Sequence, residues 1–94
     1  MAIIAKLQMQ PHDTQDYDID CSDWLPAGDG VQSVSLTSVP AMPTPPSYAI
    51  SGQVVKLWIY QGGLDGITYK VTVRPTSAAG RSKEGEVIVK IKEI

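Results

Sequence analysis

Apolar and polar residues alternate with a period of two near the start of the chain. Four apolar residues, Ile3, Ala5, Leu7 and Met9, fall on one side of an extended segment, and the residues between them from position 6 onward are polar. Because successive side chains of a β-strand point to opposite faces, this spacing predicts a half-buried strand over 3–9.

The same alternation recurs in short segments separated by turn residues. Its clearest example is 54–60, where Val55, Leu57 and Ile59 share one face. The further predicted strands are 16–21, 31–39, 48–50, 67–74 and 86–92. Four of the seven residues in segment 40–46 are prolines, which have no backbone N–H to donate, so we expect this segment to form an extended connection at a sheet edge. About seven strands, with turns roughly every eight to twelve residues, predict an all-β sandwich of two sheets.

The composition supports strands and excludes some classes of function. A chain of 94 residues is long enough for one domain. We expect residues 13–94 to form it, with 1–12 as an N-terminal strand or arm. Val and Ile outnumber Ala and Leu, and seven Pro and eight Gly favour strands and turns over helices. A formal net charge of −2 argues against a sequence-independent nucleic-acid binder. No long apolar run occurs, so we expect neither a secretion signal nor a membrane span.

Few residues are suited to catalysis or cofactor binding. His12 is the one histidine and lies beside a proline, without an evident acid–base partner. Cys21, the one cysteine, continues an alternating strand and is interpreted as a small core residue. Because a single cysteine cannot form a disulfide within the chain, the stability of the fold must come from packing of the core. The glycines within 62–66 precede a strand and not a helix, which indicates a turn and not a phosphate-binding loop. We therefore predict no enzymatic activity, no cofactor and no metal site.

Aspartates crowd the first quarter of the chain. They are Asp13, Asp16, Asp18, Asp20 and Asp23. The spacing of the middle three matches the first half of an EF-hand calcium loop. The match fails at Cys21, where that loop needs glycine, and at Ala27, where it needs a bidentate glutamate. The favoured interpretation is a solvated strand edge that discourages wrong strand pairing, with calcium as a minor alternative.

Two segments are candidates for an interaction surface. The strand over 3–9 is either the first strand of the chain's own sandwich or a strand that pairs with the edge of a neighbouring protein. Trp58 and Tyr60 form an outer aromatic surface if the opposite face of their strand is the core, whereas in the inverted register Trp58 is a core residue. The acidic start and the basic C-terminal half suit contacts between copies, and solvated strand faces have the same pattern.

Residues 64–73 resemble the corner of fibronectin type III and immunoglobulin-like domains. In that corner a leucine and a tight turn precede a tyrosine that begins an alternating strand, and Leu64, Gly66 and Tyr69 occupy these positions. The resemblance implies an immunoglobulin-like sandwich, with the Tyr69 ring in the core and its hydroxyl bonded to nearby backbone.

Motifs over most of the chain are similar to those of small virion proteins of tailed bacteriophages, the fibre-to-tail adaptors. The matching elements are 16–20, Ser22, Trp24, Leu25, Gly62, Gly63, Gly66, Thr68, Tyr69, Thr76, Gly80 and Arg81. The chain departs from this pattern at Cys21, where an aromatic residue is expected, and at 40–46, where the proline run is longer.

This second resemblance implies a structural component of a phage or prophage virion, in the tail, fibre or connector region. The implied location is the virion, after synthesis in the bacterial cytoplasm. The implied partners are other phage virion proteins and copies of the chain itself, without nucleic acid or membrane. The alternative is a particle-borne carbohydrate- or receptor-binding module that uses an exposed aromatic face with Trp58 and Tyr60.

Overall fold

Each alternating segment of the sequence forms a strand. The computed structural model describes residues 2–93, and the side chains of residues 4–93. The strands are β1 (Ala2–Met9), β2 (Gln15–Asp20), β3 (Val31–Val39), β4 (Ser47–Ser51), β5 (Val54–Ile59), β6 (Thr68–Ser77) and β7 (Gly85–Ile91). No helix occurs among the described residues.

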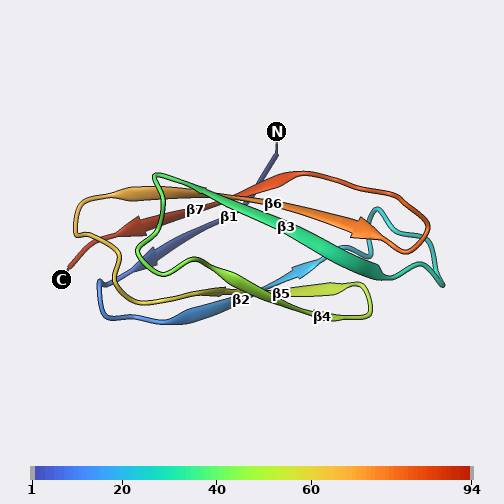
Figure 1. Cartoon of the computed structure of the whole chain (residues 1–94), viewed down its shortest axis with the longest axis horizontal. Coiled ribbons are helices and arrows are strands. Elements are labelled where there is room, and N and C mark those ends of the chain that lie inside the picture. Colours follow the sequence, from blue (N-terminus) through green and yellow to red (C-terminus); the bar gives the residue numbers. More distant parts are fainter. Residues whose placement is uncertain (1, 94) are drawn as a thin grey trace.

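The seven strands form two sheets that lie one over the other (Figure 1). Sheet A has the order β1-β7-β6-β3 and sheet B the order β2-β5-β4. Neighbouring strands are antiparallel except β1 and β7, which are parallel. The prediction of an all-β sandwich is therefore confirmed. The orders β2-β5-β4 and β3-β6-β7 also occur in constant-type immunoglobulin domains, and the narrower immunoglobulin-like assignment stays a prediction.

The core lies between the two sheets. In sheet B, Val55, Leu57 and Ile59 have no exposed surface, so their face of β5 packs inward and the face carrying Trp58 lies outside. The facing residues of sheet A are equally buried: Val71, Val73, Val87 and Val89, with Tyr69, Ile91 and Met9 beside them. β-branched residues dominate this core because they suit a pleated, half-buried surface.

Two local features depart from the simple alternation. The pairing of β1 with β7 shifts register between Ile3 and Ala5, and Ile4 packs against the core. The side chain of Ile3 lies outside the described part of the chain. β6 also continues through Pro75, beyond the predicted end at Arg74. The Pro75 carbonyl accepts a hydrogen bond from the Lys83 N–H, so the backbone of Pro75 faces segment 82–84 and not β3. The N–H that proline lacks is therefore not needed for pairing with β3, and the pairing of β6 with β3 continues past Pro75.

The proline-rich segment joins the two sheets along one side. It connects β3, at the edge of sheet A, to β4, at the edge of sheet B. Met42 in its centre is buried, and its N–H donates to the Ser38 hydroxyl at 3.2 Å. This connection covers the side of the core opposite to β1 and β2.

Candidate functional site

The predicted corner brings its three residues together. Tyr69 is buried, and its hydroxyl accepts a hydrogen bond from the Leu64 N–H at 3.1 Å. Gly66 has a φ of 82° and donates to the carbonyl of Ile91 at 2.8 Å. The Leu64 side chain itself is 63% exposed, so this residue takes part through its backbone. The corner thus fixes the loop before β6 to the end of β7.

From Ile4 onward, the apolar side chains of β1 pack against the chain's own core. Met9 is 2% exposed, and Ala5 and Leu7 are half-buried against the core cluster. The main chain of β1 pairs with another strand on one side only, because β1 is the last strand of sheet A. The Met9 carbonyl accepts from the Lys92 N–H at 2.9 Å, so the peptide groups of Met9 face the β7 side. Since these groups alternate along a strand, those of Lys6 and Gln8 face away from the sheet.

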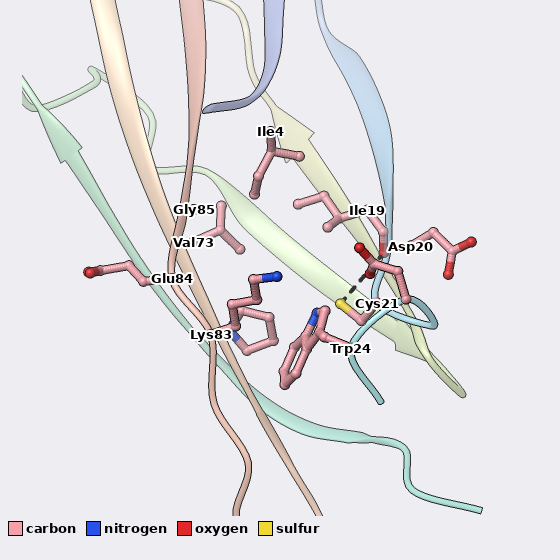
Figure 2. A pocket seen from close by; sticks show the side chains of 11 residues that line it. Ile4, Ile19, Asp20, Cys21, Trp24, Val73, Lys83, Glu84 and Gly85 are labelled. Atoms are coloured by element: carbon pink, nitrogen blue, oxygen red, sulfur yellow. Dashed lines mark hydrogen bonds between the residues drawn. The ribbon is translucent and has the colours of Figure 1, made fainter. Parts of the chain in front are cut away.

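A pocket of about 220 Å³ opens between the two sheets, beside the start of β1 (Figure 2). Its walls are mainly apolar and include Ile4, Ile19, Cys21, Trp24, Val73 and Pro75. Charged residues also line it: Asp20, Asp23, Lys83 and Glu84. Ile4 reaches toward the pocket because of the irregularity in β1, a kind of feature that commonly redirects a side chain.

Cys21 lines this pocket and is almost fully buried. It is 1% exposed, and its thiol lies 4.0 Å from the carbonyl of Ile19. Desolvation by burial raises the pKa of the Cys21 thiol, so the nucleophilic thiolate is disfavoured. The burial of Cys21 agrees with its interpretation as a core residue.

The three outward aspartates of β2 lie on the outer face of sheet B. The register places Asp16, Asp18 and Asp20 opposite Trp58, Lys56 and Val54 of β5, in that order. The Lys56 ammonium lies 2.8 Å from Asp16 and 3.2 Å from Asp18, where the calcium alternative would put a cation. The hydrogen bond between Lys56 and Asp16 lowers the pKa of Asp16 and raises the pKa of Lys56. Among the described residues no group of three or more metal-ligating side chains gathers at one point.

Trp58 and Tyr60 are half-buried on this same side of the sandwich. The Tyr60 hydroxyl and the Ser47 hydroxyl are 2.6 Å apart and share a hydrogen bond. The large hydrophobic residues that are most exposed lie elsewhere: Val39, Tyr48 and Leu64. The aromatic pair therefore forms part of a mixed surface with the aspartates and not an open platform of rings.

One charged pair was not foreseen from the sequence. Asp29 is 7% exposed, and its carboxylate accepts hydrogen bonds from Arg81 Nη1 at 2.8 Å and the Ala79 N–H at 3.2 Å. The Ser77 hydroxyl and then Arg81 hold the pKa of Asp29 below its usual value. The pair ties the turn before β3 to the β6–β7 connection. The available signal was an aspartate within a glycine-rich turn and an arginine in the opposite hairpin.

Comparison with known proteins decides the family. A family model described as podophage GP4 fiber-tail adaptor protein gp77 matches residues 9–90. The chain belongs to this family. It is accordingly a structural component of the phage virion, of the tail fibre adaptor type. No curated protein matches the gp77-type chain. In residues 2–93 there is also no helix long and apolar enough to cross a membrane.

Proposed function

We propose that this gp77-type adaptor joins neighbouring virion proteins through protein–protein contacts centred on the free edge of β1. The observation that carries the proposal is the pair of peptide groups at Lys6 and Gln8, which face away from sheet A. An added strand would form main-chain hydrogen bonds with them, a common mode of recognition for extended segments.

The pocket beside the start of β1 supports this mode of binding. A strand added to β1 would run past Ile4 and would place one apolar side chain against Ile19 and Trp24. Main-chain pairing would then provide affinity, and the pocket with its charged neighbours would provide selectivity. The mechanism is shape and edge complementarity, without a chemical step or a cofactor. The chain would be made in the bacterial cytoplasm and incorporated there into the particle.

The test compares two proline substitutions in β1. Gln8→Pro removes an N–H from the free edge, and Leu7→Pro removes an N–H that faces β7. We expect Gln8→Pro to keep the thermal stability of the Gln8→Ala control but to be lost from purified phage particles, as measured by quantitative mass spectrometry. Leu7→Pro should unfold at a clearly lower temperature. Incorporation of Gln8→Pro at the level of Gln8→Ala would refute partner binding through the free edge of β1. Absence of the parent chain from particles would refute the adaptor role.

The carbohydrate-binding alternative receives less support. Sugar rings stack on open aromatic faces, whereas Trp58 and Tyr60 are half-buried and the Tyr60 hydroxyl is bonded to Ser47. Tryptophan fluorescence, titrated with host surface polysaccharide, distinguishes the two roles. A spectral shift that disappears in Trp58→Phe would favour the carbohydrate-binding role, and an unchanged spectrum would count against it.

A further inference from the structure

The outer face of sheet A is basic. The residues of β1, β6 and β7 that point away from the core include Lys6, Lys70, Arg74 and Lys90, and Glu86 is the acidic residue among them. Glu86 is already paired with Lys70, at 3.6 Å. The other three cations form no ion pair with any described residue. This face therefore has positive charge without an internal partner.

The outer face of sheet B carries the opposite charge. Asp16, Asp18 and Asp20 line up along β2, and Lys56 is the one basic residue among the outward positions of sheet B. Lys56 is shared between the first two aspartates, so the face remains negative. The Asp20 carboxylate accepts a hydrogen bond from the Ser22 N–H and forms no ion pair with any described residue. The two broad faces of one molecule thus have charges of opposite sign.

The two faces also match in their apolar centres. On sheet A, Ile88 is half-buried in a row between Lys6 and Lys70. A hollow of about 280 Å³ lies over this part of the face, with Ile88 and Lys90 in its lining. On sheet B, Trp58 is half-buried in a row with Asp16. Each face therefore has an apolar residue beside charged ones.

We propose that copies of this chain stack front to back, with the basic face of one on the acidic face of the next. Trp58 of one copy would lie over the hollow at Ile88 of its neighbour, and Asp16 and Asp18 would approach Lys6 and Lys90. This inference rests on the proposed function, since it names a second copy as one protein partner of the adaptor. The contact joins two different surfaces, so it repeats from copy to copy and closes into a ring or continues as a stack.

The size of the faces is sufficient for a specific contact. The molecule measures 43 × 22 × 18 Å, so each broad face is of the order of the 800 Å² per partner found in a standard protein interface. The charges around the rim are exposed, so they would mainly set the partner and the register, and salt would weaken them. The free edge of β1 lies at the side of the stack and would remain open to another virion protein.

Charge exchange between the faces tests the stack. Lys6→Glu with Lys90→Glu makes both faces acidic. Asp16→Lys, Asp18→Lys, Asp20→Asn and Lys56→Glu together make both faces basic, while opposite charges still adjoin within sheet B and residue 20 keeps an acceptor for the Ser22 N–H. We expect the parent chain in low salt to show a weight-average mass at least about twofold above the monomer in light scattering. Each variant alone should be monomeric, and an equimolar mixture should recover the assembly. Added sodium chloride should reduce the mass of the parent.

Two outcomes would overturn the proposal that copies stack front to back. One is a parent chain that stays monomeric in low salt at high concentration. The other is a pair of variants that assemble alone as the parent does. Circular dichroism melting establishes that each variant is folded. A variant that does not fold is replaced by a single substitution, Lys90→Glu or Asp18→Lys, which weakens the charge on one face and should lower the mass of the assembly in low salt. Gln8→Pro should stack like the parent, so loss of the stack and loss of the β1 edge contact are read out separately.

Discussion

Arg81 Nη1 lies 2.8 Å from the Asp29 carboxylate, and this contact joins two loops that are 52 residues apart in the sequence. Asp29 is nearly enclosed, while Arg81 remains largely exposed. The arginine therefore shields from solvent a carboxylate that has little access to water. The relationship holds one end of the sandwich together without contributing to the apolar core.

Removal of this arginine should destabilise the fold. Arg81→Ala leaves the Asp29 carboxylate with fewer donors in a place of low solvent access, and we expect the Tm to fall by about 5 °C. Arg74→Ala, at an exposed position on β6, is the matched control and should change Tm little. Differential scanning calorimetry at neutral pH measures both. Equal Tm values for the two variants would contradict the structural role of the Asp29–Arg81 pair.

Acid should remove part of the stability. The pKa of Asp29 is lowered from 3.8 in the folded chain, chiefly by the Ser77 hydroxyl and Arg81. A carboxyl with a depressed folded-state pKa stabilises the fold above its unfolded value, and this contribution is lost as pH falls through the folded value. The free energy of unfolding of Asp29→Asn should therefore fall less than that of the parent from pH 5 to about pH 2. Urea titrations across this range measure the difference, and parallel curves would contradict it.

Loss of the corner hydroxyl should also weaken the fold. Tyr69→Phe keeps the buried ring but leaves the Leu64 N–H without its acceptor, and we expect a loss of about 1 kcal/mol in the free energy of unfolding. Tyr48→Phe removes an exposed hydroxyl and serves as control. Urea denaturation of both variants gives the comparison. A smaller effect at position 69 than at 48 would argue against a structural corner.

Gly63 should not tolerate a side chain. A Cβ built at this position would lie 2.7 Å from Cγ1 and 2.8 Å from Cδ1 of Ile91, which is buried. Gly63→Ala should therefore lower the free energy of unfolding by about 1–3 kcal/mol through overpacking. In combination with Ile91→Ala, which opens space, the substitution should cost less than it does alone. A double-mutant cycle measures this coupling, and additive effects would show that the two positions do not meet.

The alternating pattern in the sequence predicted where strands lie, but not always which of their faces is buried. Val55, Leu57 and Ile59 are separated by residues that differ from them only partly in polarity, so the pattern predicted the strand but left its inward face open. Burial against the valines of sheet A selects that face, which is a property of the partner sheet. The irregularity at Ile4 was hidden because two isoleucines in succession fit either register.

Contacts between distant segments were beyond the reach of local pattern. The glycine-rich turn around Asp29 and the hairpin around Arg81 can each be recognised from the sequence, but local pattern does not pair them, because the two residues meet only after β3 and β6 pair. Pro75 likewise indicated the end of a strand, yet its missing donor falls on the side where β7 no longer pairs. The corner at Tyr69 could be interpreted from sequence because its partner, Leu64, is five residues away.

The parallel pairing of β1 with β7 sets the order in which the molecule can be completed. The first strand is synthesised before all the others, but its place in sheet A exists only after β7 has been made. Pairings between such distant segments form slowly, because a long loop must close before they contribute stability. During synthesis the apolar face of β1 therefore remains uncovered for longer than that of any other strand. A chain interrupted before β7 would expose this strand and be prone to aggregation or proteolysis, which would keep incomplete adaptors out of the particle.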